Sequence, residues 1–167
     1  MKKVNKTRFA LLGILGLGPR TGYDIKKLID RSIGFFWNEN FGHLYPMLKK
    51  LKEEGLVGMN VEDTGGGRPH RNVYAATARG KKSFLSWLRT PITRQPMRHE
   101  LLLRVFFGRQ LSPAELAVFI REEKEYHEKM LERYGAIEEQ IRRYDSPDLP
   151  YWLMTLEYGG AHSRMII

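Results

Sequence analysis

The stretch GHLYPMLKKLKEEGLV, residues 42–57, decides the fold of this chain. Leu44, Met47, Leu48 and Leu51 recur at helical spacing, so the stretch predicts a short helix with one apolar face. Its last two residues, leucine and valine, have the character of a β-strand. The stretch therefore joins a helix to a strand through a single glycine turn.

Pro46 and Gly55 set the limits of this helix. A proline in a helix interior costs about 3 kcal/mol, because it lacks an N–H group and its ring clashes with the preceding turn. With Asn40 as the cap, Pro46 would lie deep inside the helix. We therefore expect the helix to begin near His43 or Leu44, after an entering turn, so that Pro46 lies in its first turn. Gly55 ends the helix.

Two further helices are expected before this stretch. The first covers about residues 5–16 and ends in a sequence rich in glycine, with a proline beyond. The second begins at Thr21, which is followed three residues later by Asp24 as in a capped N-terminus. Its apolar residues keep helical spacing as far as Gly34.

A β-hairpin and a fourth helix are expected after it. Residues 56–61 and 72–77 are short runs of β-type residues on either side of TGGGRP, residues 64–69. Thr77 then caps a helix that reaches a linker at 90–93. This order of elements is that of a winged helix-turn-helix, whose third helix fits the major groove of DNA.

The second half is expected to be all helical. One helix covers about residues 95–108, and Ser112 to Glu115 form a capping box with a proline at the first helical position. That second helix runs to about Tyr144, and a last helix covers about residues 150–167. The fold class is mostly α (α+β). A winged helix-turn-helix domain with a two-stranded wing at 1–90 is followed by an all-helical dimerisation domain at 95–167.

The long helix carries apolar residues at alternating spacings of four and three, which is typical of a coiled-coil seam. Together with two residues of the preceding helix they are the expected homodimer contacts: Leu102, Phe106, Met130, Tyr134, Ile137, Ile141 and Tyr144. The chain ends on an apolar run without a helix cap. We therefore expect the natural protein to continue beyond Ile167.

The excess of positive charge is confined to the first half. Residues 1–90 hold 17 Lys and Arg and 7 Asp and Glu, a net charge of +10, whereas residues 91–167 hold 11 and 12, a net charge of −1. Such a basic region attracts a polyanion, because each neutralised phosphate releases counterions. Double-stranded DNA is the expected partner. A solvated basic surface or an anionic lipid surface is the alternative on charge alone.

The composition excludes several classes of protein. The chain has no cysteine, which removes disulfide frameworks, thiolate metal sites and cysteine nucleophiles. It has no stretch of about 18 uncharged apolar residues, which a membrane span requires. The apolar run at 9–17 is not followed by a signal-peptide cleavage site. We expect a cytoplasmic protein without a membrane partner.

A catalytic site is not expected. The five histidines show neither H-E-x-x-H spacing nor a local partner suited to zinc, and no G-x-S-x-G motif is present. The glycines at 65–67 join two strands and lack the lysine of a P-loop. We expect no enzyme activity, no cofactor and no metal.

These segments resemble the PadR family of bacterial transcriptional regulators. The resemblance rests on GYDI at 22–25, on RNVYAATARG at 71–80, and on residues 42–57, which are similar to the family signature G-x-L-Y-P-x-L-x-x-L-x-x-x-G-L-[IV]. ELLLRVFFG at 100–108 resembles the start of the helical dimerisation region in members with a longer C-terminal part. The resemblance implies a DNA-binding homodimer and, in some members, a small aromatic effector.

The expected DNA contacts follow from this resemblance and from residue polarity. They lie at the start of the third helix and in the wing: Asn40, Gly42, His43, Tyr45, Lys49, Arg68, His70 and Arg71. Lys50 and Lys52 are expected to face solvent. The alternatives are that Tyr45 is a core aromatic residue, that His43 contacts nothing, and that the wing is only a solvated loop.

Aromatic residues of the two halves are candidates for an effector pocket, because aromatic faces suit planar apolar ligands. The candidates are Phe36, Trp37, Phe107 and Trp152. Packing between the two halves is the alternative role for them.

The sequence therefore predicts a sequence-specific transcriptional regulator, a repressor that binds an inverted repeat as a homodimer. A response to a small aromatic effector and regulation without an effector are both open. The alternative is a winged-helix adaptor that binds protein without binding DNA. The charge of the first half favours the regulator, because a protein-binding winged domain has no need of it.

Overall fold

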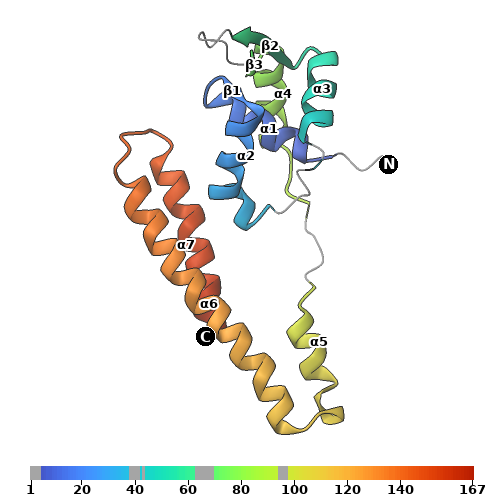
Figure 1. Cartoon of the computed structure of the whole chain (residues 1–167), viewed down its shortest axis with the longest axis vertical. Coiled ribbons are helices and arrows are strands. Elements are labelled where there is room, and N and C mark those ends of the chain that lie inside the picture. Colours follow the sequence, from blue (N-terminus) through green and yellow to red (C-terminus); the bar gives the residue numbers. More distant parts are fainter. Residues whose placement is uncertain (1–4, 38–41, 43, 63–69, 94–97) are drawn as a thin grey trace. The chain divides into compact units, whose positions relative to one another are not determined.

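The computed structural model describes residues 5–37, 42, 44–62, 70–93 and 98–167. The chain divides into two compact units, Met1–Thr93 and Arg94–Ile167 (Figure 1). We refer to them as the winged unit and the helical unit and describe each by itself.

The winged unit begins with helices α1 (Thr7–Gly16) and α2 (Gly22–Arg31), followed by a short 3-10 helix, η1 (Ile33–Phe35). Thr21 caps α2, as predicted. Its Oγ1 accepts a hydrogen bond from the Asp24 N–H at 3.2 Å, and the Asp24 carboxylate accepts one from the Thr21 N–H at 3.4 Å. These two bonds satisfy N–H groups that the helix itself leaves without a partner.

Helix α3 (Leu44–Glu53) confirms the inference drawn from Pro46. Because the helix begins at Leu44, Pro46 is its third residue, where a backbone N–H would have no partner within the helix. Leu48 and Leu51 are fully buried. At Gly55 the backbone φ is +70°, a left-handed conformation that glycine adopts without a Cβ penalty. This turn directs the chain into the sheet.

The sheet has three antiparallel strands in the order β1-β3-β2, namely β1 (Arg20–Thr21), β2 (Val57–Glu62) and β3 (Arg71–Ala76). Strands β2 and β3 are the predicted hairpin. Strand β1 was not predicted, because two residues are too few to show the alternation of a strand. It pairs with β3 through Arg20 opposite Tyr74.

Helix α4 (Ala78–Leu88) closes the winged unit. The Thr77 hydroxyl caps it by accepting a hydrogen bond from the Gly80 N–H at 3.0 Å, and it donates to the Gly55 carbonyl at 2.9 Å. Trp87 stacks on Phe9 of α1, with 4.7 Å between the ring centres. Aliphatic residues of α1, α2 and α3 complete the core, which holds α3 at a fixed place beside the sheet.

The helical unit consists of α5 (Glu100–Phe106), η3 (Gly108–Gln110), α6 (Pro113–Ile141) and α7 (Leu149–Ile166). Helix α7 runs back along α6 (Figure 1). The predicted capping box is confirmed, since the Ser112 N–H donates to the Glu115 carboxylate at 2.8 Å. Helix α6 ends at Ile141, three residues before the predicted end at Tyr144. Helix α5 ends before the predicted end at Gly108, because the chain tightens there into a 3-10 turn.

Candidate nucleic-acid interface

The exposed face of α3 is the centre of the candidate interface. Tyr45, Lys49 and Lys52 follow one another at spacings of four and three, and all three are exposed. Residues at these spacings lie on one side of a helix. Leu44 and Leu48 face the core on the opposite side. We call Tyr45, Lys49 and Lys52 the recognition row.

Tyr45 is 60% exposed, so it is not a core residue. One side of its ring nevertheless covers Gly22, the first residue of α2. Burial raises the pKa of Tyr74 in β3, and the nearby phenol of Tyr45 raises it further. The start of α3 is therefore in contact with α2 and close to the sheet.

Lys52 is exposed, as predicted. Its ammonium nitrogen lies 4.0 Å from the Met59 sulfur in β2, so it stands between the recognition helix and the wing. The spacing from Lys49 to Lys52 continues the row begun by Tyr45. Lys50 is also exposed but lies off this row.

Several predicted DNA contacts lie outside the described residues, namely Asn40, His43 and Arg68. Gly42 and His70 are described and exposed. Their proposed contacts with DNA remain predictions.

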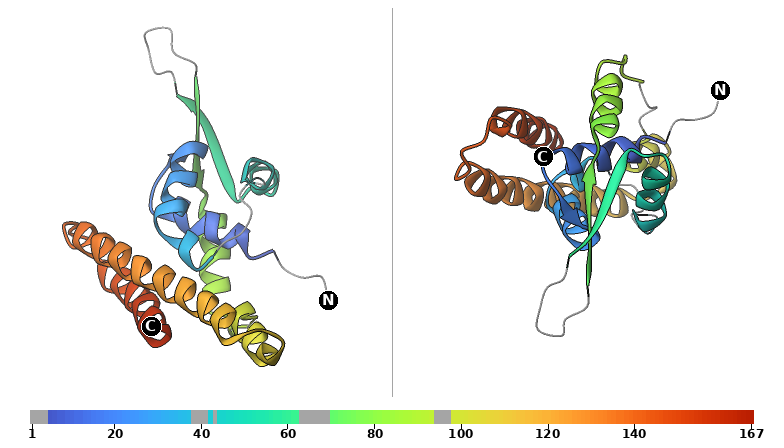
Figure 2. Two further views of the ribbon diagram at one scale, coloured as in Figure 1. Left: turned by 60° about the horizontal axis from the view of Figure 1, so that its bottom comes forward. Right: turned by 90° about the horizontal axis from the view of Figure 1, so that it is seen from above.

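Strands β2 and β3 project beyond the helices of the winged unit (Figure 2). Arg71 begins β3 and is exposed, and its partner across the ladder is Glu62. Side chains directly opposite each other in an antiparallel pair are neighbours, so Glu62 partly offsets the charge of Arg71. The wing thus presents less net positive charge at its described end than the arginine alone suggests.

Helix α2 adds exposed cations that the sequence reasoning did not assign. Lys26 forms an ion pair with Asp30 at 2.6 Å, and the Lys27 ammonium lies 6.0 Å from the centre of the Tyr23 ring. Arg31 is exposed at the end of the helix. In helix-turn-helix proteins the first of the two helices crosses the DNA backbone. The adjacent residues Lys26 and Lys27 were the feature of the sequence that could have indicated such a basic helix.

Helix α6, which carries the predicted seam, packs on α7 of the same chain. Met130, Tyr134, Ile137 and Ile141 are half-buried, and α6 packs on α7 over this region. A Cβ atom added at Gly159 of α7 would lie 3.0 Å from the Tyr134 ring. Tyr134 therefore contacts a residue of its own chain, while Tyr144 is exposed beyond the end of α6. Their role in a dimer remains a prediction.

A polar contact also joins α6 to α7. The His127 Nδ1 and Ser163 Oγ lie 3.0 Å apart, and both residues are buried. The His127 Nε2 lies 3.4 Å from a carboxylate oxygen of Glu123. The two helices are thus joined at a defined register.

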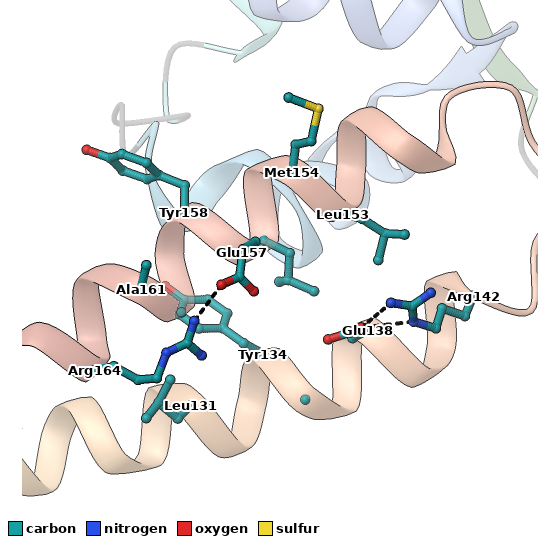
Figure 3. A pocket seen from close by; sticks show the side chains of 13 residues that line it. Leu131, Tyr134, Glu138, Arg142, Leu153, Met154, Glu157, Tyr158, Ala161 and Arg164 are labelled. Carbon is teal, nitrogen blue, oxygen red and sulfur yellow. Dashed lines mark hydrogen bonds and ion pairs between the residues drawn. The ribbon is translucent and has the colours of Figure 1, made fainter.

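An open groove of about 720 Å³ lies between α6 and α7 (Figure 3). Leu131 and Leu153 contribute apolar surface to it. Ion pairs line it as well: the Arg142 Nε lies 2.8 Å from the Glu138 carboxylate, and an Arg164 nitrogen lies 2.6 Å from that of Glu157. The groove offers apolar surface beside two guanidinium groups.

The most exposed apolar side chains of the helical unit lie on α5 and α7. Leu102 and Phe106 are 57% and 81% exposed. On α7 the large exposed side chains are Tyr151, Met154, Tyr158 and Met165. Exposed apolar residues of this size are candidates for an interaction surface.

The four aromatic residues expected at an effector pocket are divided between the two units. Phe36 and Trp37 belong to the winged unit, and Phe107 and Trp152 to the helical unit. Phe36 and Phe107 are each 60% exposed. The pocket itself remains a prediction.

Within the described ranges, no group of three or more His, Asp or Glu side chains is arranged to hold a metal ion. Over the same residues, none of the helices has both the length and the apolar character needed to cross a membrane.

Two family models match the chain. Residues 11–85 match the transcriptional regulator PadR-like family, and residues 97–167 match the family described as virulence activator alpha C-term. The negative transcriptional regulator PadR of Bacillus subtilis strain 168 is 27% identical over 157 residues, which are 88% of this chain and 84% of that protein.

The matches to solved structures cover both units. The protein smu.1604c of Streptococcus mutans UA159 is 31% identical with a TM-score of 0.78, over 95% of this chain and 92% of the other. Bacillus subtilis PadR in complex with operator DNA is 25% identical with a TM-score of 0.83, over 96% and 92% of the two chains. The same protein in complex with p-coumaric acid is 26% identical with a TM-score of 0.76, over 96% and 91%. This chain, with its winged unit and its long helical unit, belongs to the PadR-like family of transcriptional regulators.

Proposed function

We propose that this chain is a homodimeric repressor that binds an inverted repeat in double-stranded DNA in the cytoplasm. The recognition row carries the proposal, because it presents a tyrosine and two lysines on the exposed face of the third helix, beside a projecting wing. That arrangement suits a helix in the major groove with a wing on the neighbouring backbone. The relative that was solved with operator DNA supports it.

Repression is proposed from the similar Bacillus subtilis protein, which is named a negative transcriptional regulator. A repressor needs only to occupy its operator, and the winged unit supplies charge for this. The predicted DNA contacts in the loop before α3 and in the wing are part of the proposal: Asn40, Gly42, His43, Arg68, His70 and Arg71.

The dimer is proposed to form through the helical unit. The exposed apolar surface comes from Leu102 and Phe106 on α5 and from the exposed apolar residues of α7. Burying such surface in an interface is favourable, because it removes apolar groups from water. A two-fold axis would place two recognition rows in successive major grooves, about 34 Å apart. This dimer explains why an inverted repeat is the expected site.

A small aromatic acid is the proposed effector class, because a relative was solved with p-coumaric acid. Phe36, Trp37, Phe107 and Trp152 are the proposed pocket residues. If the proposal is right, p-coumaric acid or a related phenolic acid will release a bound operator duplex, and Trp152→Ala will weaken that release. Release by none of a panel of such acids contradicts the effector part alone.

Selection of duplexes from a random library tests the DNA-binding proposal. The full chain is expected to enrich one palindromic site at moderate salt, and the affinity for it is expected to fall steeply as salt rises. If no duplex is enriched, the proposal is wrong and the protein-binding alternative becomes the better account.

A further inference from the structure

Gly22 and Tyr45 are matched in size. Gly22 is buried at the start of α2, beneath the Tyr45 ring of α3. A Cβ atom at position 22 would lie 2.6 Å from the Cε1 atom of Tyr45, and 3.0 Å from its Cζ and hydroxyl oxygen. Carbon atoms in good contact lie about 3.5–4.0 Å apart. The ring therefore occupies the space that any side chain at position 22 would need.

Backbone conformation does not explain the glycine. Among the described residues, only Gly18 and Gly55 have positive φ values, so Gly22 has a conformation open to other residues. Alanine would favour a helix over glycine by up to about 1 kcal/mol. The neighbour that an added side chain at position 22 would meet is therefore the Tyr45 ring, which would have to move to make room for it.

The contact joins the two helices of the helix-turn-helix at their N-terminal ends. Tyr45 is the second residue of α3, and its remaining surface is exposed. Lys49 lies one turn further along the same row. A displacement of the Tyr45 ring would thus disturb the part of α3 that faces the DNA.

We propose that the contact between Gly22 and Tyr45 sets the position of the first turn of α3, so that Gly22 is a specificity-determining positioning residue that does not itself touch DNA. This inference rests on the proposed DNA-binding function. It also assigns the Tyr45 ring to positioning α3, while its hydroxyl group is not needed to read a base.

A double-mutant cycle in thermal unfolding tests the contact without DNA. Gly22→Ala is expected to lower the Tm of the full chain, because the added methyl group overpacks against the ring. In the Tyr45→Ala background the same substitution is expected to raise the Tm or leave it unchanged, because the ring is gone and alanine favours the helix. Gly16→Ala is the matched control, since no atom lies within 4 Å of its added Cβ. If Gly22→Ala leaves the Tm unchanged both in the wild-type chain and in the Tyr45→Ala chain, the inference is overturned.

DNA binding tests the consequence. Gly22→Ala is expected to weaken binding to the selected duplex about tenfold and to leave binding to a random duplex within about twofold. Tyr45→Phe is expected to keep specific binding, because it retains the ring, whereas Tyr45→Ala loses it. Equal losses for Phe and Ala would assign the role to the hydroxyl group and overturn the inference. If the wild-type chain selects no duplex, the proposed function fails as well. If the wild-type chain selects a duplex and the Gly22→Ala chain binds that duplex with the same affinity, only this inference fails.

Discussion

Lys49 shows what a single residue contributes to the proposed interface. It is exposed in the middle of the recognition row, and it forms no ion pair with another residue in the described part of the chain. Lys26, by contrast, is paired with Asp30. A lysine without a carboxylate partner can neutralise a phosphate without first breaking an ion pair.

Lys49→Ala is therefore expected to weaken binding to all duplexes to a similar degree and to reduce the slope of log affinity against log salt by about 1. Fluorescence anisotropy at several salt concentrations measures both quantities. Lys129→Ala, an exposed lysine of α6, is the control and should leave the slope unchanged. A loss confined to the selected duplex would contradict the assignment to phosphate.

Ser163 tests a buried polar contact at the same scale. Ser163→Ala leaves the Nδ1 atom of buried His127 without its partner, which is expected to lower the free energy of unfolding by about 1–3 kcal/mol. Urea unfolding of the full chain at one fixed protein concentration measures it. Exposed Ser86→Ala is the control. No difference between the two variants would show that the contact contributes nothing.

At the scale of elements, the helix starts that depend on residues close together in the sequence were predictable. Pro46 fixed the start of α3, and Thr21 and Ser112 marked two helix starts, because capping depends on residues only three positions apart. Strand β1 and the packing of Tyr45 on Gly22 were not predictable, since both depend on residues distant in sequence. The contact between Tyr134 of α6 and Gly159 of α7 was not predictable for the same reason, because a periodic apolar face does not say which helix covers it.

The capping box at the start of α6 gives a prediction about pH. Hydrogen bonds from the Ser112 hydroxyl and backbone N–H groups lower the pKa of Glu115. The stabilisation is fully present above the ordinary pKa of glutamate and is lost as the pH falls through the lowered pKa of the folded state. Glu115→Gln is expected to remove this part of the acid dependence, measured as the difference in Tm between the wild type and variant from pH 7 to pH 3.

Glu132→Gln, an exposed glutamate on the same helix, is the control for this titration. A Glu115→Gln variant whose Tm falls with acid in parallel with that of the wild type would show that the capping carboxylate does not contribute.

At the scale of the whole molecule, the nearly neutral helical unit complements the basic winged unit. One unit binds the DNA backbone in the proposal, and the other sets the spacing of two copies. Membership of a family of transcriptional regulators agrees with the expectation that the chain is not an enzyme. What the sequence could not specify is the operator, because base contacts depend on side-chain geometry at the groove.

Phe106→Glu tests the dimer at this scale. Phe106 is 81% exposed on α5, so a charge there costs little in a monomer, whereas it would be buried without a partner in the proposed interface. Sedimentation at micromolar concentration is expected to show a dimer for the wild type and a monomer for the variant. Leu85→Glu on α4, 51% exposed, is the control and should remain dimeric. A monomeric wild type would contradict the dimer.

A hydroxyl-radical footprint on the selected duplex tests the central claim most directly. The account predicts two protected patches, related by a two-fold axis and separated by about one helical turn of 10 base pairs. Protection of a single patch, or of none at concentrations that saturate binding, would contradict it.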